Sequence, residues 1–300
     1  MIRIGPTEEN ILREVTNAIS EKLNSIGIFN RVFSRIKTKN SIDKKLTTKK
    51  EEYSAKNKKM QDVFGIRVTV YFSDDEQVAV DLVKTLFEEV PDAHSIDTLD
   101  KDRFGPIRNN LVFKVEEKLI STSSLFDQEL IDSTFEVQFR TVFSEGWHEV
   151  EHDLRYKCRI DWKNEDVLSR QLNGQFATLE TCSWAMLKIF DELAYKKYKS
   201  KQWDSFFRNT LRIRFEDLSF SIPIINILNN EPNIMKELLK IERTRLILSL
   251  TKLTSNLPLK MDNVLFIINR GLVKNEELSK LEPELLKKIL DESFPISITV

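Results

Sequence analysis

The chain has 300 residues, of which 41% are hydrophobic and 31% charged, and its 46 basic and 47 acidic side chains give a net charge of −1. This composition supports one large or two modest globular domains and excludes an intrinsically disordered chain. The N-terminal stretch lacks the basic-then-apolar order of a signal peptide, and no apolar run approaches the roughly 18 residues that span a bilayer. Two cysteines and three histidines form no zinc signature. We therefore expect a soluble protein of the reducing cytosol.

A basic block follows the first predicted helix. Residues 7–30 are predicted to be helical, with Thr7 as the N-cap and an apolar stripe that ends near Gly27. From Arg31 to Lys59, 11 basic residues accompany only 3 acidic ones. This local charge indicates a polyanionic partner, either a nucleotide triphosphate or an RNA backbone, although a solvated lysine-rich helix would have the same composition.

Four residues of this block stand at the spacing R-x-K-x3-S-x3-K. They are Arg35, Lys37, Ser41 and Lys45. A triphosphate needs several cations, and guanidinium offers a planar fork where ammonium offers a point charge. Next, residues 65–72 alternate as a strand, with Arg67 on the face opposite the apolar side chains and Asp62 just before it. Taken alone, Asp62 is explained equally well as the cap of a turn.

The most informative stretch is Thr134–Lys157. Its first part alternates, so Glu136, Gln138 and Arg140 should project from one face of a strand and the apolar residues from the other. The period then changes to that of a helix with its polar residues in a column. The residues of this pattern are Trp147, Glu151, His152 and Tyr156. A strand of functional groups that leads into a polar-lined helix indicates a site, whereas the plainer interpretation is an edge strand followed by a surface helix.

The segments between these motifs are predicted to support the sheet. A helix that starts at Asp75 is stopped by Pro91, residues 92–110 form a loop, and residues 111–115 read as a strand. Residues 164–199 carry apolar side chains at helical spacing and are predicted to be core.

After Trp203 the chain is predicted to change character. Residues 211–215 read as a short strand or a helix start, and short amphipathic helices follow at 222–228, 234–253, 264–272 and 278–290. No catalytic spacing occurs in these last hundred residues. We therefore predict a domain over residues 1–200 and a helical appendage over 201–300 that serves self-association, regulation or the binding of a protein partner.

The blocks of functional residues resemble, in their order, the synthetase domain of RelA/SpoT-type nucleotide pyrophosphokinases, which include the small alarmone synthetases. The blocks are Arg35/Lys37/Ser41/Lys45, Asp62/Gly65/Arg67, Glu136/Gln138/Arg140 and Trp147/Glu151/His152/Tyr156/Lys157. The resemblance covers about residues 30–160. It implies an α+β fold with a mixed nucleotidyltransferase-like sheet flanked by helices. The implied activity is transfer of the β,γ-pyrophosphate of ATP to the ribose 3′-hydroxyl of an acceptor, usually GDP or GTP, as in the alarmone synthesis of the stringent response.

The resemblance also implies roles for individual residues. Asp62 and Glu136, from the ends of adjacent strands, would bind Mg²⁺, and Glu136 would also accept the proton of the attacking hydroxyl. The ATP-binding residues would be Arg35, Lys37, Ser41, Lys45 and Arg67, with the serine opening a helix that carries the last lysine. The acceptor side would consist of Gln138, Arg140, His152, Tyr156, Lys157, Phe104 and Arg108.

One element departs from the family pattern. The family usually carries N-G-Y-R-S-x-H, whose tyrosine stacks on the acceptor guanine, where this chain has Phe104-Gly105-Pro106-Ile107-Arg108-Asn109-Asn110. Phe104 either replaces that stack or anchors a loop. Three alternatives therefore stay open: a toxic relative that pyrophosphorylates the tRNA 3′ end or adenine nucleotides, another nucleotidyl transfer on the same fold, and a catalytically silent nucleotide-sensing or protein-binding module. Retention of both acids and of the cation set argues against the silent module.

Overall fold

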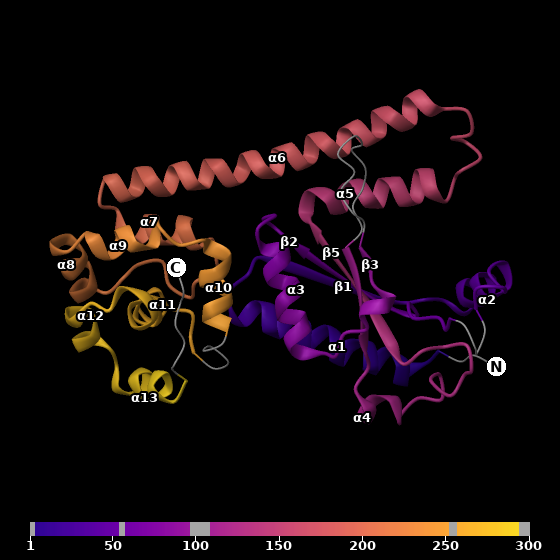
Figure 1. The fold of residues 1–300 in the computed structure, drawn as a ribbon, viewed down its shortest axis with the longest axis horizontal. Coiled ribbons are helices and arrows are strands. Elements are labelled where there is room, and N and C mark those ends of the chain that lie inside the picture. Colours follow the sequence, from indigo (N-terminus) through magenta and orange to yellow (C-terminus); the bar gives the residue numbers. More distant parts are fainter. Residues whose placement is uncertain (1–3, 54–57, 97–108, 252–256, 294–300) are drawn as a thin grey trace. The chain divides into compact units, whose positions relative to one another are not determined.

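The computed structural model describes residues 4–53, 58–96, 109–251 and 257–293 (Figure 1). The chain forms two compact units, a sheet unit of Met1–Lys22 and Asn30–Thr181 and a helical unit of Leu23–Phe29 and Cys182–Val300. The division falls inside a long helix, and the domain boundary predicted after residue 200 stays a prediction. Within the described ranges, every helix is too short or too polar to cross a membrane.

A mixed sheet forms the centre of the sheet unit, with the strand order β1-β2-β5-β4-β3 (Figure 1). The strands are β1 (Asn30–Ile36), β2 (Phe64–Val70), β3 (Ser95–Ile96), β4 (Asn109–Lys114) and β5 (Thr134–Thr141). β2 and β5 run parallel, and the other neighbouring pairs run antiparallel. The predicted α+β fold with a mixed, helix-flanked sheet is confirmed.

Helices of the sheet unit precede, connect and follow the strands. They are α1 (Pro6–Ser25), α2 (Lys39–Thr48), α3 (Asp75–Leu86), the 3₁₀ turn Pro91–Ala93, α4 (Glu117–Ile120), α5 (Val142–Glu151), the π-helical turn His152–Tyr156 and α6 (Asp166–Lys199), which continues into the helical unit. The prediction that Ser41 opens the helix with Lys45 is wrong by one turn. Thr38 is the N-cap, because its side chain accepts a hydrogen bond from the Ser41 amide at 3.4 Å.

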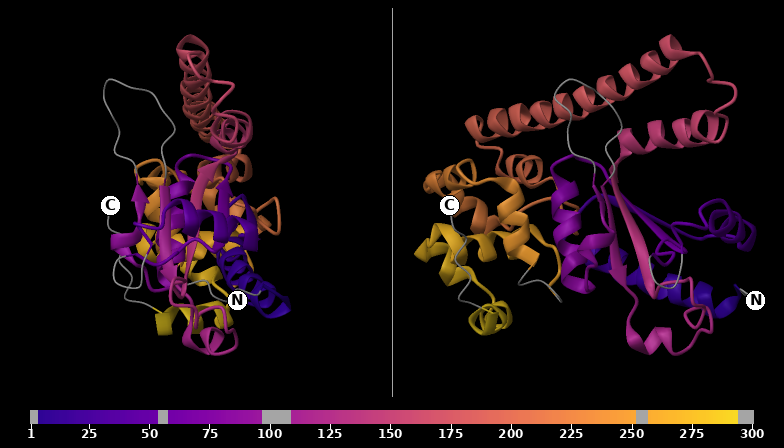
Figure 2. Two further views of the ribbon diagram at one scale, coloured as in Figure 1. Left: turned by 90° about the vertical axis from the view of Figure 1, so that its right-hand side faces the viewer. Right: turned by 45° about the vertical axis from the view of Figure 1, so that its right-hand side comes forward.

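The two faces of the sheet differ in polarity, as the alternation predicted. Phe135, Val137 and Phe139 of β5 are buried, while Glu136 and Gln138, which point the other way, are only partly covered. Helix α3 packs against β2 and β5 (Figure 2). Since burial of the apolar side chains holds the sheet in place, the polar face is left for binding.

The prediction that residues 164–199 are core is wrong for much of α6. Phe176 and Leu187 are buried, but Val167, Trp184 and Ile189 are exposed. The apolar positions of this 34-residue helix are spread over more than one face. A single neighbouring surface cannot cover all of them, because residues four apart share a face and residues two apart do not.

The helical unit consists of short helices. They are α7 (Trp203–Leu211), α8 (Ile222–Asn230), α9 (Asn233–Leu238), α10 (Arg243–Thr251), α11 (Met261–Ile268), the π-helical turn Asn269–Val273, α12 (Glu276–Leu281) and α13 (Glu284–Ser293). Residues 211–215 form no strand: α7 ends at Leu211, and Arg212 takes the left-handed conformation that terminates a helix. The predicted helices 234–253 and 278–290 are each broken into two.

The end of α1 and the residues directly after it, Leu23–Phe29, belong to the helical unit. Leu23, Ile26 and Ile28 are buried. The Arg214 amide donates a hydrogen bond to the Gly27 carbonyl at 2.7 Å. Gly27 has a φ of +74°, and a Cβ added there would lie 2.7 Å from the Arg214 carbonyl oxygen. Glycine is therefore required at position 27, where the backbone of Arg214 comes close. The hydrogen bond to Arg214 also ties residues 23–29 to the helical unit.

Candidate functional site

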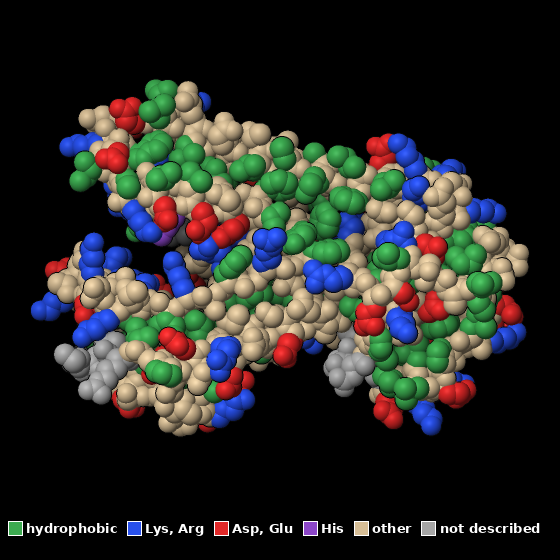
Figure 3. Space-filling model, turned by 180° about the vertical axis from the view of Figure 1, so that it is seen from behind, with side chains coloured by type: hydrophobic (Ala, Val, Ile, Leu, Met, Phe, Trp, Pro, Cys, Tyr) green, Lys and Arg blue, Asp and Glu red, His purple; other side chains and the backbone are tan. Residues whose placement is uncertain are grey.

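A cleft of about 530 Å³ lies on the polar face of the sheet, between β1 and the helical segment that follows β5. Its hollow is visible in Figure 3, with lysine and arginine side chains gathered beside it. The predicted site residues that line it are Arg35, Lys37, Ser41, Asp62, Arg67, Glu136, Gln138, His152 and Lys157. Lys45, Arg140 and Tyr156 do not line this cleft. Phe104 and Arg108 lie outside the described residues.

Strand register brings these residues together. Arg35 pairs with Gly65, which pairs with Glu136 on the other side. Two residues further along β2, Arg67 pairs with Phe33 on β1 and with Gln138 on β5. Residues that pair across a sheet project from the same face, so motifs more than 100 positions apart in the chain share one surface.

The lysine end of the cleft, defined here as Lys37 and Asp62 in the lining together with Lys45 beside it, holds two cations on one carboxylate. The ammonium groups of Lys37 and Lys45 lie 2.6 and 2.7 Å from the same Oδ2 atom of Asp62. The other oxygen, Oδ1, is buried and has no hydrogen-bond partner among the described residues. This end therefore has one positive charge in excess and one carboxylate oxygen that is unpaired.

Burial and ion pairing set the protonation of the lysine end. Burial lowers the pKa of Lys37, and the charge of Asp62 offsets this only in part. Burial also opposes the charge on Lys45, but Asp62 and Tyr53 outweigh it and raise the Lys45 pKa. For Asp62, burial would raise the pKa, yet Lys37 and Lys45 together lower it. The carboxylate is thus ionised at neutral pH, as a metal site requires.

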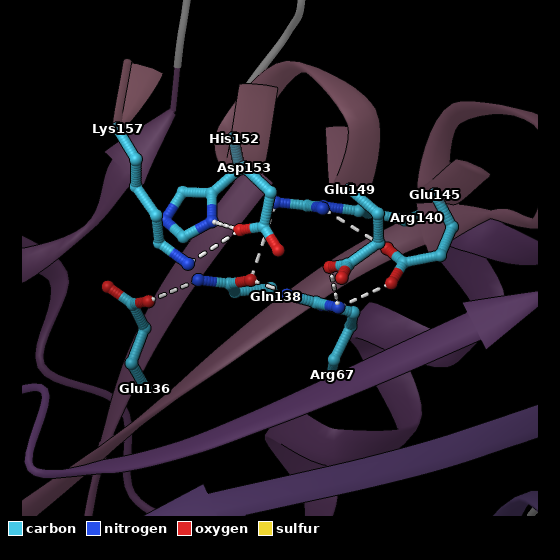
Figure 4. A network of polar contacts seen from close by, with 9 residues as sticks. All are labelled: Arg67, Glu136, Gln138, Arg140, Glu145, Glu149, His152, Asp153 and Lys157. Atoms are coloured by element: carbon cyan, nitrogen blue, oxygen red, sulfur yellow. Dashed lines mark hydrogen bonds and ion pairs between the residues drawn. The ribbon is translucent and has the colours of Figure 1, made fainter. Parts of the chain in front are cut away.

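The arginine end of the cleft, defined as Arg67 and Glu149 in the lining together with Arg140 and Glu145 beside it, is balanced in charge (Figure 4). Arg67 forms ion pairs with both Glu145 and Glu149, and Arg140 lies 3.1 Å from Glu145. Glu145 is 14% exposed and Glu149 53% exposed. The sequence reasoning missed both glutamates. Their spacing of four residues, on a helix that directly follows the arginine-bearing strand, is the signal that could have found them.

A buried histidine lies close to the arginine end. The ring of His148 packs against Trp147 and Phe176 and is 8% exposed. Burial, together with the charges of Arg140 and Arg67, lowers the pKa of His148 to about 3. This ring is therefore neutral in the folded protein, because burial and the two nearby positive charges both disfavour its protonated form.

Gln138 connects Glu136 to the arginine end of the cleft (Figure 4). Its Nε2 donates to Glu136 Oε1 at 2.7 Å, and its Oε1 accepts from Arg140 Nη2 at 3.4 Å. Glu136 is thereby held in a fixed orientation beside the cleft, while one of its oxygens stays outside this hydrogen bond. A carboxylate that is held in this way is placed to accept a proton or bind a cation.

The π-helical turn contributes the upper wall of the site (Figure 4). His152 Nδ1 and Lys157 Nζ both contact Asp153 Oδ1, at 2.9 and 2.6 Å. Tyr156 stacks on the His152 ring with centroids 5.7 Å apart. The structure therefore brings His152 and Lys157 to the cleft, whereas Tyr156 does not line it. Trp147 is a core residue, whose Nε1 donates to the Leu172 carbonyl at 2.9 Å.

The residues of the cleft fit a hard divalent cation. Mg²⁺ is bound in proteins through one or two carboxylates and completes its shell with water and phosphate oxygens. Asp62 Oδ1 is an unpaired buried carboxylate oxygen, and Glu136 lines the same cleft. In the parts of the chain that the structure describes, no group of three or more His, Cys, Asp or Glu side chains forms a metal-binding cluster. The fit is therefore to a cation shared with a phosphate ligand.

Fold and site together define an α+β protein in which the polar face of a mixed sheet forms a cation-rich cleft with two carboxylates. A family model described as the region found in RelA / SpoT proteins matches residues 34–161. The chain therefore contains a RelA/SpoT-type domain, and the resemblance predicted from the motifs is confirmed.

Solved structures of similar proteins come from several bacteria. Small alarmone synthetase 1 from Bacillus subtilis, bound to its product pppGpp, is 22% identical over 61% of this chain and 95% of its own, with a TM-score of 0.48. Small alarmone synthetase 2 from the same organism is 21% identical over 61% and 92%, with a TM-score of 0.44. A GTP pyrophosphokinase family protein from Streptococcus pneumoniae is 22% identical over 63% and 95%, with a TM-score of 0.42. Comparison with curated proteins gave no match.

Proposed function

We propose that this protein is an ATP-dependent nucleotide pyrophosphokinase, which transfers the β,γ-pyrophosphate of ATP to the ribose 3′-hydroxyl of GDP or GTP. The observation that carries the proposal is the lysine end of the cleft, where Lys37 and Lys45 share one oxygen of Asp62 and the other oxygen is unpaired. Surplus positive charge beside a free carboxylate oxygen suits a triphosphate with its metal ion.

In the proposed reaction the 3′-hydroxyl oxygen attacks the β-phosphorus of ATP, the bond from that phosphorus to the α–β bridging oxygen breaks, and AMP leaves. Glu136 accepts the hydroxyl proton, and Gln138 keeps it oriented through the 2.7 Å hydrogen bond. Lys37 and Lys45 offset the charge that moves toward the leaving AMP. Asp62 and Glu136 would hold Mg²⁺, which supplies further charge neutralisation on the phosphate oxygens.

The test is transfer of label from ATP. The protein is incubated with ATP labelled at the β- or the γ-phosphate and with GDP, GTP, ATP or deacylated tRNA, and the products are separated. Both labels should move to the same acceptor, with one AMP released for each product. Transfer of the γ-label alone would indicate an ordinary kinase and overturn the proposal. ATP binding without any transfer would instead favour the catalytically silent, nucleotide-sensing module.

RNA is the second candidate acceptor, because lysines outside the cleft remain exposed. Lys50, Lys58 and Lys59 are exposed in the basic segment, and none of them lines the cleft. If a tRNA 3′ end is the acceptor, modification should fall steeply between about 50 and 200 mM salt. Replacement of Lys49, Lys50, Lys56, Lys58 and Lys59 by glutamine should flatten that dependence, while efficient, salt-insensitive GDP modification would exclude RNA.

We further propose that the protein is cytosolic, which cell fractionation would test. We also propose that residues 201–300 bind a protein partner or a second copy of this chain, which a pull-down experiment would test.

A further inference from the structure

The outer side of strand β1 has no neighbouring strand among the described residues. β1 lies at one edge of the sheet and pairs with β2. Directly after β1, the Lys37 amide donates to the Val63 carbonyl at 2.8 Å, so these two residues form a hydrogen-bonded pair. Such pairs alternate with non-hydrogen-bonded ones in an antiparallel ladder, so the backbone groups of Val32, Ser34 and Ile36 point away from β2. In the part of the chain that the structure describes, these outward groups have no hydrogen-bond partner.

A groove of about 940 Å³ runs along this free edge, between β1 and the flank of α1. Leu12 on α1 and Ile36 on β1 give it apolar surface. Its buried carboxylate, Glu8, is already satisfied, because it accepts hydrogen bonds from the Gly5 amide at 2.7 Å and from the Ser123 hydroxyl. The groove thus combines unpaired backbone groups on one side with apolar side chains on the other, as the addition of a strand requires.

Positive charge lines the same edge. Arg31 and Arg35 are both exposed, and neither forms an ion pair within the described residues. They are four positions apart on a strand, so their side chains project from the same face. Arg13 and Lys39 add further positive charge along the groove, against the negative charge of Glu9. An acidic strand is therefore attracted to this edge, and a basic one is repelled.

A second copy of β1 does not suit the edge. Antiparallel pairing of two copies over the whole strand places Asn30 of one copy opposite Ile36 of the other, so Arg31 of each copy faces Arg35 of the other. Like charges directly opposite one another destabilise a sheet. Charged side chains on an edge strand are one way in which proteins prevent their own edges from pairing. The charge of this edge therefore selects a partner of opposite sign.

We propose that the outer edge of β1 binds an extended acidic segment of a partner protein, which extends the sheet by one strand. The carboxylates of that segment face Arg31 and Arg35, and its alternate residues are apolar and lie in the groove beside Ile36 and Leu12. The recognised feature is the alternation of acidic and apolar residues, and not acidic composition alone. This inference goes beyond the proposed function, because the docking requires neither a nucleotide nor catalysis.

Peptide titrations test alternation and charge separately. The full-length protein is titrated without nucleotide, because Arg35 also lines the cleft, and the anisotropy of short fluorescently labelled peptides is recorded. One peptide alternates glutamate with valine or threonine, a second has the same composition with its glutamates contiguous, and a third has lysine in place of each glutamate. The first should bind roughly tenfold or more tightly than either of the others, because it alone places carboxylates and apolar side chains on opposite faces.

Variants of the edge test the arginine and the backbone. Arg31→Glu should weaken the alternating acidic peptide roughly tenfold and strengthen the lysine peptide. Lys44→Glu makes the same charge change at an exposed position outside the groove and should leave both affinities close to wild type. Ser34→Pro removes an outward N–H and should also weaken the acidic peptide roughly tenfold, whereas Ser34→Ala keeps that N–H and should bind it like wild type.

Three results would overturn the proposal. Equal binding of the alternating and the contiguous acidic peptides, or equal losses in Arg31→Glu and Lys44→Glu, would show a general charge attraction. A wild-type dimer in analytical ultracentrifugation that is lost in Ser34→Pro would show that a second copy occupies the edge. Melting curves check that each variant is folded. If Ser34→Pro melts early, Arg31→Glu still decides, because replacement of an exposed side chain leaves the backbone of the edge intact. Absence of pyrophosphate transfer would overturn the proposed function and leave this inference standing.

Discussion

The two ends of the cleft use the same kinds of side chain with opposite electrostatic results. At the lysine end, two ammonium groups share one carboxylate, so positive charge is left over. At the arginine end, two guanidiniums face two carboxylates, and the arrangement is balanced. An anion is therefore attracted to the lysine end directly, whereas at the arginine end it must first displace a glutamate from Arg67.

This difference shows that the number of cations in a motif does not by itself locate a phosphate site. Arg67 and Lys37 both belong to the motifs that resemble an ATP site, yet in the structure Arg67 is already paired twice. The charge that remains after pairing decides which end holds the triphosphate. Each of the following predictions tests this contrast.

The largest effect is expected from the carboxylates. Asp62→Asn or Glu136→Gln should lower turnover about 10²- to 10⁴-fold, because each removes a metal-binding charge, and Glu136→Gln also removes the general base. Steady-state transfer assays measure this, with Glu88→Gln as a control on an exposed carboxylate that pairs with Lys114. Turnover near wild type at saturating Mg²⁺ in either variant would remove the proposed site.

Loss of surplus charge at the lysine end should come next. Lys37→Gln is expected to raise the KM for ATP roughly ten- to hundredfold, since hydrogen bonds to charged groups contribute about 1.5–3 kcal/mol each. Lys44→Gln, an exposed position on the same basic segment that does not line the cleft, is the control and should leave KM unchanged. If the two variants behave alike, the lysine end is not where the triphosphate binds.

The free energy of unfolding should depend on pH because of the buried His148 ring near the arginine end. The pKa of His148 is about 3 in the folded protein against 6.5 in the unfolded chain, so only the unfolded chain binds this proton between those values. The contribution to stability is complete above pH 6.5 and is lost as pH falls, by about 1.4 kcal/mol per pH unit. His148→Phe should lack this loss. Chemical denaturation at pH 7 and pH 5 would show it, and equal losses in both proteins would contradict the assignment.

The smallest effect should follow from freeing Arg67. Glu149 is 53% exposed, so its ion pair with Arg67 contributes at most about 1 kcal/mol. Glu149→Gln should therefore lower the KM for ATP only a few-fold, by leaving Arg67 available to the nucleotide. Glu192→Gln, which breaks an exposed pair with Lys196 on α6, is the control. A large fall in turnover would instead show that Glu149 takes part in the reaction.

Much of the sheet and of the lysine end could be predicted from the sequence. The alternation in β5 fixes which side chains of that strand are buried, because successive residues of a strand point to opposite faces. The spacing of Lys37, Ser41 and Lys45, with Asp62 before the next strand, indicated the cations and the acid that the structure brings together. The alternation in β5 is a property of a single strand. Lys37, Lys45 and Asp62 lie within 26 consecutive residues, so their spacing can be read from one short segment of the sequence.

The pairing at the arginine end was decided only by the tertiary structure. A strand pattern shows that Arg67 points to the polar face, but the helix that meets it there comes from residues 142–151, more than 70 positions later. The same limit applies to α6 and to the end of α1, since periodicity identifies an apolar stripe and not the element that covers it. Strand β1 illustrates the same limit: it was not predicted from the sequence, and only the sheet register places Phe33 in a cleft with Gln138 and Asp62. Local sequence fixes the face on which a side chain lies, whereas its partners depend on contacts between distant segments that form only when the whole core packs.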